Sequence, residues 1–222
     1  MNIFFIDRDP VLAARYHCDK HVPKMIVEYA QLMSTAHRLL DGEPYETKNK
    51  RGHKLTRWRF SDDREHKLYL AAHYKHPSNI WVRSSTQHYD WLYELFNALC
   101  AEFTLRYGKF HKTDLDLREY IKRKPDNLQD NGWSDPPLAM PDEYKLTVKS
   151  SVPSYRNFYA TEKRRFATWK TEKPHWYDWW CMLNDTFRSK SETVREHVYF
   201  ESREWYIYRR YFTQIIFYGI KT

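Results

Sequence analysis

The stretch YHCDKHVPKMIVEYAQLMSTAHRLL, residues 16–40, decides the fold of this chain. The polar side chains in it that can do chemistry follow one another at intervals of four, three, four and three residues, and they are His17, His21, Lys24, Glu28 and Gln31. This spacing places them along one face of a helix. Apolar side chains mark the opposite face, namely Met25, Tyr29, Leu32, Met33, Ala36 and Leu40. The pattern therefore predicts an amphipathic helix that packs on a core and presents a polar edge.

Pro23 determines where this helix begins. A proline inside a helix costs about 3 kcal/mol, so we expect a break near Asp19 and a helix that runs to Leu40 with Pro23 in its first turn. His17 then belongs to the preceding segment, and the polar stripe becomes a cluster at a helix junction.

Further helices are predicted by the residues that start and end them. Asp9-Pro10 and His76-Pro77 are typical helix starts, because proline suits the first helical position. Residues 86–107 carry apolar side chains at helical spacing and are followed by Gly108, a typical C-cap.

The middle of the chain is less regular. Residues 54–60 and 66–72 flank the turn-like stretch SDDRE and predict a small β-hairpin that directs Arg57 and Arg59 outward. Residues 122–145 contain four of the ten prolines, which is typical of a long ordered loop.

The C-terminal part divides into two predictions. Residues 154–170 form a basic, aromatic run that predicts a helix, and a shorter helix is expected after residues 173–180. Residues 197–220 mix strand-like alternation with helical spacing and receive no assignment. The fold class is therefore mainly α: one helical domain over residues 1–186, which carries catalysis and nucleic-acid binding, with a C-terminal extension over 187–222 packed on it.

Length and cysteine content limit the class of protein. A chain of 222 residues buries a sizeable core without disulfides. Cys18, Cys100 and Cys181 are odd in number and scattered, which indicates reduced thiols and a cytoplasmic location. The first residues lack the apolar run of a signal peptide, and no stretch approaches the roughly 18 apolar residues of a membrane span. We expect no membrane partner.

Charge and aromatic content together favour nucleic acid as a partner. Lys and Arg number 37 against 29 Asp and Glu, a net charge of +8, and aromatic residues make up 18% of the chain. Cations meet phosphates, and aromatic faces meet unstacked bases. An aromatic core beneath a basic surface is the alternative explanation of the same composition. Arg106, Lys109, His111 and Lys112 gather at one predicted helix end, where both the helix dipole and a bound phosphate favour them.

Five strings of sequence carry a resemblance to a known group. NIFFxDxDP, HCDKHVxKM, HPSxIW, RYGKxHK and PPxAMPDxYK occur in order from residue 2 to residue 145. In these strings the chain resembles small uncharacterised proteins of tailed phages. The resemblance implies a phage protein acting in the host cytoplasm, and it brings no activity with it.

A more remote resemblance rests on the order of elements. A histidine-bearing first helical segment, a long middle helix ending in an R-x-G-like turn, and a P-x-W-Y segment recur in the phage pyrimidine-dimer DNA glycosylases of the endonuclease V type. Here these are YHCDKHVPKM, WLYELFNALCAEFTLRYGK and KPHWYDWW. The resemblance implies an all-α fold and attack on the sugar C1′ by an α-amine, assisted by a glutamate.

The chain departs from that family at both chemical positions. The second residue is Asn2, before which methionine is generally retained, so the expected amine is in question. Alignment on His17 places Lys24 where the family has its carboxylate, with Glu28 one turn later. A buried Lys24 with a pKa lowered by His21 would itself form a Schiff base with deoxyribose. Retention of a binding fold without activity is equally compatible with these substitutions.

The sequence thus predicts a DNA glycosylase or lyase-like enzyme, active in repair or modification, that extrudes a damaged or modified base from duplex DNA without a cofactor. Its catalytic residues would be His17, His21, Lys24 and Glu28. Its nucleic-acid-binding residues would be Arg83, Arg106, Lys109, His111, Lys112, Tyr155, Arg156, Lys163, Trp176 and Tyr177.

Three alternatives stay open at this stage. One is a phage transferase for modified bases or another nucleotide-handling enzyme, which would bind a free nucleotide more tightly than DNA. Another is a non-catalytic inhibitor of a host defence that binds a protein or a nucleotide. The third concerns metal: His17, Cys18 and His21 have the ligand types of a zinc site, although the sequence offers no fourth ligand.

Overall fold

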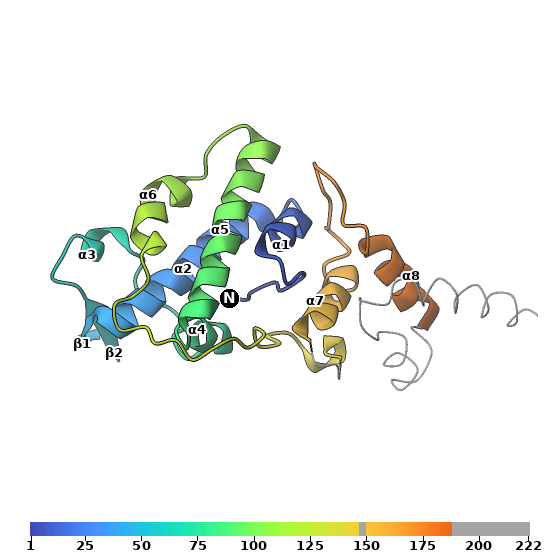
Figure 1. The fold of residues 1–222 in the computed structure, drawn as a ribbon. Coiled ribbons are helices and arrows are strands. Elements are labelled where there is room, and N and C mark those ends of the chain that lie inside the picture. The colour runs from blue at the N-terminus through green and yellow to red at the C-terminus, as the bar shows by residue number, and fades with distance from the viewer. Residues whose placement is uncertain (147–149, 188–222) are drawn as a thin grey trace, which may run out of the picture. The chain divides into compact units, whose positions relative to one another are not determined.

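The computed structural model describes residues 1–146 and 150–187, and these are mainly helical with one small antiparallel hairpin (Figure 1). The chain divides into two units, Met1–Asp185 and Thr186–Thr222. The mainly α class is confirmed. The predicted C-terminal extension lies outside the described residues apart from Phe187.

The described elements follow one another in a simple order. They are α1 (Pro10–Tyr16), α2 (His21–Asp41), β1 (Glu43–Lys48), β2 (Lys54–Arg59), α3 (Arg64–Lys67), α4 (Pro77–Val82), α5 (Thr86–Tyr107), α6 (Lys112–Lys122), the 3-10 turn η1 (Asp142–Tyr144), α7 (Ser151–Ala160) and α8 (Tyr177–Phe187). None of these helices is long and apolar enough to cross a membrane.

The junction between α1 and α2 forms as its local signals predict. The Asp9 carboxylate caps α1 and accepts a hydrogen bond of 2.7 Å from the backbone N–H of Val11. The chain then leaves the helix at His17 and enters α2 at His21, so that Pro23 lies in the first turn. A proline there removes no intrahelical hydrogen bond.

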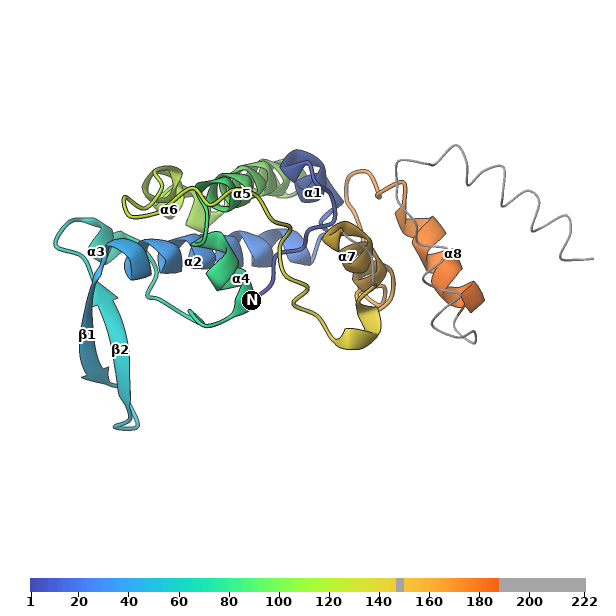
Figure 2. The same cartoon turned by 60° about the horizontal axis from the view of Figure 1, so that its bottom comes forward.

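Helix α5 forms the centre of the unit. It packs against α1 and α2, and Figure 2 shows α1, α5 and α6 above a second layer that contains α2 and α4. The helix ends at Gly108, whose φ of 66° is the left-handed conformation that the C-cap prediction requires. The first residues of the chain run between the helices, with Ile3, Phe5 and Ile6 fully buried.

The hairpin pairs differently from the prediction. Strand β2 forms over the predicted residues, but its partner is β1, with Glu43 opposite Arg59 and Lys48 opposite Lys54. The expected partner segment instead begins with the last two residues of α3 and forms no strand, and the buried guanidinium of Arg38 donates to the backbone oxygens of residues 65, 68 and 69. That network holds the segment against the end of α2.

Two further segments differ from expectation. Helix α6 lies between the predicted cation cluster, which ends at Lys112, and the predicted loop, which begins at Lys122, and no element was predicted for the residues between them. Helix α7 ends at Ala160, well before residue 170. The chain turns there because its continuation pairs with the α1–α2 junction, where the backbone N–H of Asp19 donates to the carbonyl of Thr168 at 2.8 Å.

Candidate functional site

The polar stripe of α2 divides into two pairs with different surroundings. His17 and His21 lie in the core, at 0% and 4% exposure. The side chain of Lys24 is 63% exposed and that of Glu28 is 18% exposed. The break at the helix junction turns the histidines inward, while the next two turns of α2 reach the surface.

His17 is held by two hydrogen bonds. Its Nδ1 donates to the carbonyl of Ala13 at 2.6 Å, and its Nε2 accepts from the Tyr29 hydroxyl at 2.8 Å. Burial lowers the pKa of His17 to about 4. The imidazole is therefore neutral near pH 7, and both of its nitrogens are already used by the protein.

His21 is equally enclosed. Its Nδ1 forms a hydrogen bond of 2.5 Å with the Tyr159 hydroxyl, and its ring stacks on Phe4 with 4.5 Å between centroids. Burial, supported by nearby His17 and Lys163, lowers the pKa of His21 to about 3. A group that is neutral throughout the physiological range is a poor proton donor, so both histidines serve as core packing in this structure.

Glu28 lies between two amines. Lys24 Nζ is 3.3 Å from Oε1 of Glu28, and the Met1 ammonium is 3.9 Å from Oε2. The backbone N–H of Asn2 donates to the same Oε2 at 3.3 Å. A single, mostly buried carboxylate thus faces a lysine on one side and the first two backbone nitrogens on the other.

The first residues are fixed in this position by the rest of the chain. The Asn2 side chain donates to the Ala139 carbonyl at 3.0 Å and accepts from the Tyr155 hydroxyl at 2.8 Å. The backbone N–H of Phe4 donates to the Tyr29 hydroxyl at 3.3 Å. The loop before η1, α7 and α2 therefore all contribute to holding residues 1–4 beside Glu28.

His76 joins this group from a distant part of the chain. It caps α4, where its Nδ1 accepts from the backbone N–H of Ser78 at 3.2 Å. Partial burial and the nearby Met1 ammonium lower its pKa, and Glu28 acts in the opposite direction. Because Nδ1 accepts, the neutral ring carries its proton on Nε2 and presents a hydrogen-bond donor. We define Met1, Asn2, Lys24, Glu28 and His76 as the Glu28 cluster.

His73 lies beside His76 and has an unusual backbone. Its φ of 48° is a left-handed conformation that only His73 adopts among the described non-glycine residues. Such conformations cost energy and concentrate at functional positions. Sequence analysis identified His76 only as a helix start. The available signal was the His-x-x-His spacing directly before Pro77.

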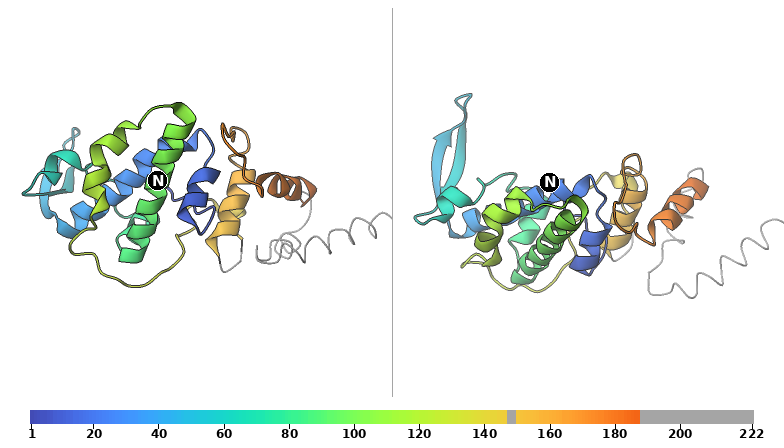
Figure 3. Two further views of the ribbon diagram at one scale, coloured as in Figure 1. Left: turned by 45° about the horizontal axis from the view of Figure 1, so that its top comes forward. Right: turned by 90° about the horizontal axis from the view of Figure 1, so that it is seen from above.

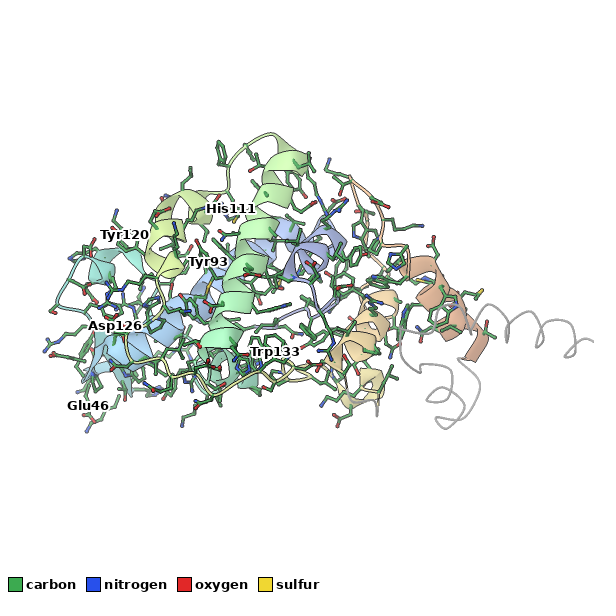
Figure 4. All side chains as sticks on the ribbon, in the orientation of Figure 1. Glu46, Tyr93, His111, Tyr120, Asp126 and Trp133 are labelled. Carbon is green, nitrogen blue, oxygen red and sulfur yellow. The ribbon has the colours of Figure 1, made fainter. Side chains whose placement is uncertain are left out.

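Four predicted phosphate contacts lie at accessible or partly accessible positions. Nη1 of Arg83 is buried with no hydrogen-bond partner among the described residues, and burial lowers the pKa of Arg83. Lys109 and Lys112 are exposed, and Lys112 pairs with Asp116 at 2.5 Å. His111, labelled in Figure 4, caps α6 by accepting from the backbone N–H of Thr113.

The other predicted binding residues are engaged by the protein itself. The Arg106 guanidinium is fully buried and pairs with Glu102 at 2.9 Å. Arg156 pairs with Asp7 at 2.9 Å and lies over Trp176. Lys163 lies over a phenylalanine ring at 4.3 Å, and burial lowers its pKa.

The aromatic residues predicted to stack on bases are buried. Tyr155 is 0% exposed, and Trp176 and Tyr177 are 4% and 6% exposed. In this structure their rings pack against other side chains and present no open face for a base. The alternative explanation of the composition, an aromatic core, accounts for these three positions.

No metal centre is present in the part of the chain that the structure describes, where no three His, Cys, Asp or Glu side chains gather closely enough to hold an ion. His17 and His21, proposed as zinc ligands, instead hydrogen bond with two different tyrosines.

No protein family, curated protein or solved structure matches this chain.

Proposed function

We propose that this protein is a DNA glycosylase or lyase-like enzyme that acts on a damaged or modified base, with an amine of the Glu28 cluster as its nucleophile. The observation that supports the proposal is the position of Glu28 between two amines, 3.3 Å and 3.9 Å away. Amine and carboxylate in contact are the groups that the remote family resemblance implies.

The chemistry needs only groups of the Glu28 cluster. The neutral amine forms a bond to C1′ of the deoxyribose, the glycosidic C–N bond breaks, and the base leaves with the electron pair. Glu28 accepts the proton that the amine loses, and His76 donates a hydrogen bond from Nε2 to the departing base. The nitrogen lone pair then forms the C1′=N bond as the C1′–O4′ bond breaks, O4′ takes the proton held by Glu28, and the departed base takes a proton from water. The product is an iminium between C1′ and the enzyme. Extrusion of the nucleotide brings C1′ within reach.

Two amines compete for the role of nucleophile. Lys24 is exposed and reaches Oε1 of Glu28, whereas the amine of Met1 lies on the side of Oε2. The sequence-based idea of a buried Lys24 does not hold, because its side chain is 63% exposed. An α-amine of Met1, or of Asn2 after processing, therefore stands as an equal candidate.

Borohydride trapping tests the proposal. Oligonucleotides that carry an abasic site, a pyrimidine dimer or a modified thymine are incubated with the protein, and the imine is reduced to a stable amine. We expect a covalent adduct on at least one substrate. Peptide mapping of that adduct then assigns the nucleophile either to Lys24 or to the first residue of the mature protein.

Matched variants separate chemistry from non-specific trapping. Glu28→Gln keeps the size of the side chain and removes its charge, so we expect the adduct to form at least tenfold more slowly. Lys122→Ala removes an exposed lysine far along the sequence that has no proposed role in binding, and it should leave trapping unchanged. Absence of an adduct on every substrate, or an adduct insensitive to Glu28→Gln, would contradict the proposal.

A further inference from the structure

The β1–β2 hairpin stands away from the helices. We define the ribbon as residues 43–59, which comprise both strands and the turn between them. Figure 3 shows it projecting from the end of α2, and no third strand of the described chain pairs with it. Strand β1 is exposed at every position except Thr47, which is partly exposed, so the ribbon contributes little to the core.

The ribbon is strongly basic. It contains Lys48, Lys50, Arg51, Lys54, Arg57 and Arg59 but only two acidic residues, Glu43 and Glu46, a net charge of +4. Arg59 pairs with Glu43 at 3.7 Å at the base of the ribbon. The other five cations have no ion pair within residues 1–146 and 150–187. Half of the net charge of the chain therefore lies on these 17 residues, most of which are exposed.

Two of these cations face each other. Lys48 and Lys54 are direct cross-strand partners at the outer end of the strands. Like charges placed directly opposite destabilise a hairpin. An anion bound between them would relieve the repulsion, which makes the tip a natural position for phosphate.

The tip is ordered in advance of any ligand. The Asn49 side chain accepts hydrogen bonds from the backbone N–H groups of Arg51 at 2.9 Å and His53 at 3.0 Å. Gly52 closes the turn with a φ of 81°, a conformation that glycine adopts without strain. Binding therefore requires little loss of backbone entropy at the tip.

The base of the ribbon is fixed to α2. Nη1 of Arg38 donates to the carbonyl of Trp58 at 2.8 Å, and the Trp58 ring packs edge-on against Tyr74. At Gly42 a Cβ atom would lie 2.6 Å from the carbonyl of Arg38, so only glycine permits this close passage. The ribbon is thus an extension of a rigid helix.

From this geometry we propose that the ribbon binds duplex DNA by entering the major groove, with Lys50, Arg51 and Lys54 on the phosphates. The major groove of B-DNA, about 12 Å wide, accepts a two-stranded antiparallel ribbon. The deep and narrow major groove of an RNA duplex does not. The inference deepens the proposed function, because it names the element that holds the duplex while the Glu28 cluster acts.

The spacing between the two regions suits a single duplex. Glu28 and Asp41 are thirteen residues apart on the same helix. At a rise of about 1.5 Å per residue, the base of the ribbon lies roughly 20 Å along α2 from Glu28. A duplex that crosses this distance spans about six base pairs.

The ordinary explanation of the charges is protection of exposed strands. Lysines on an edge strand discourage pairing with another chain, and they do so without any ligand. An acidic side chain also places a charge on the edge and discourages such pairing. Replacing the tip cations with glutamate therefore preserves edge protection and removes the attraction to DNA, so the two explanations predict different results.

The test measures binding of undamaged 20-base-pair DNA over a series of salt concentrations. We compare wild type with the ribbon variant Lys50→Gln/Arg51→Gln/Lys54→Gln and with the control variant Lys122→Gln/Lys170→Gln/Lys173→Gln, which removes the same charge from exposed positions outside the ribbon. We expect the ribbon variant to lose about three from the slope of log K against log salt and at least tenfold in affinity. The control should bind within about twofold of wild type.

Further measurements decide between the explanations. The glutamate version of the ribbon variant should keep the oligomeric state of wild type and bind DNA no better than the glutamine version. Equal losses in the ribbon and control variants, or equal wild-type affinity for an RNA duplex of the same sequence, would overturn the proposal. Failure of the proposed chemistry and failure of the proposed DNA binding give different results. Glu28→Gln should bind undamaged duplex as tightly as wild type, whether or not wild type forms an adduct.

Discussion

Titratable and charged side chains are buried at one end of α2 and exposed beyond the other. At the first turn His21 is buried and bonded to Tyr159, and the adjoining His17 is bonded to Tyr29. Beyond the last turn the ribbon exposes cations that have no carboxylate partner in the described chain. This difference shows that residue type alone does not identify a functional site. What matters is whether the protein already occupies the polar atoms.

Glu28 lies between these extremes. It is mostly buried, yet its partners include Lys24, which remains exposed to solvent. A carboxylate in this intermediate position is held firmly, while 18% of its side chain remains exposed to solvent. For this reason the Glu28 cluster, and not the pair of histidines, is the better candidate for chemistry.

The largest effect is expected at Arg106, which ties α5 to the buried end. Its guanidinium donates to the carbonyls of His17 at 2.7 Å and Arg15 at 2.8 Å and pairs with Glu102. Arg106→Met leaves a buried charge and two carbonyls without partners, so we expect a loss of about 3–5 kcal/mol in the free energy of unfolding, measured in urea. Lys109→Met, at an exposed position, should change it by less than about 0.5 kcal/mol. A loss below about 1 kcal/mol at Arg106 would restore it as a candidate phosphate ligand.

The buried end should also be sensitive to acid. The pKa of His17 is about 4 in the folded protein, below the ordinary value, so the unfolded chain binds a proton first as the pH falls. The contribution of His17 is complete above about pH 6.5 and should fall by roughly 3 kcal/mol by pH 4, after which this loss stops. His21, with a pKa of about 3, adds a loss of the same sign that continues to lower pH.

Substitution of His17 isolates this contribution. His17→Gln keeps a donor and an acceptor but does not titrate, so its free energy of unfolding should fall less between pH 7 and pH 4. His66→Gln, at an exposed position, should retain the wild-type profile. Superimposable pH profiles for wild type and His17→Gln would show that burial of this imidazole does not control acid stability.

A smaller effect is expected at the exposed end. Gly52→Ala forces an L side chain into a φ of 81° without any steric clash, and it should cost about 1 kcal/mol. Gly132→Ala meets the same conditions in another loop and serves as the matched control. Only Gly52→Ala should accelerate amide hydrogen exchange at residues 49–54. Equal exchange in both variants would mean that the tip is not ordered by this turn.

The smallest effect on stability is expected at Lys24. Its ion pair with Glu28 is exposed on the lysine side, and such pairs contribute at most about 0.5 kcal/mol. Lys24→Ala should therefore melt within about two degrees of wild type while its behaviour in borohydride trapping reports on chemistry alone. A loss above about 1 kcal/mol in the free energy of unfolding would assign Lys24 a structural role. The trapping result for Lys24→Ala would then no longer report on chemistry alone.

Helix ends that are marked by a capping residue, a proline or a glycine were predictable from sequence. Asp9, Pro23 and Gly108 each impose a backbone requirement on their immediate neighbours, and the starts and ends of α1, α2 and α5 follow them. Helix α6 lacked such a signal, because few apolar residues mark its buried face. The prediction of residues 66–72 as the partner of β2 was wrong for a similar reason. The residues of those strands carry no signal of the hydrogen bonds from Arg38 that hold this segment elsewhere.

The candidate site was predictable only in part. Lys24 and Glu28 are one helical turn apart, so their contact follows from sequence. The approach of Met1, Asn2 and His76 does not, because it depends on how segments distant in sequence pack together. The aromatic residues show the same limit: composition suggested base stacking, whereas packing places Tyr155 and Trp176 in the core.

The sequence by itself determined the helical class, the amphipathic character of α2 and the basic charge of the ribbon. These properties depend on residue type and local spacing, which are complete in a single segment. Only the tertiary structure decided which histidines are buried and which carboxylate meets an amine. Burial and electrostatic environment are set by neighbours that are distant along the chain, and they determine whether the same imidazole or carboxylate packs a core or remains free for a ligand.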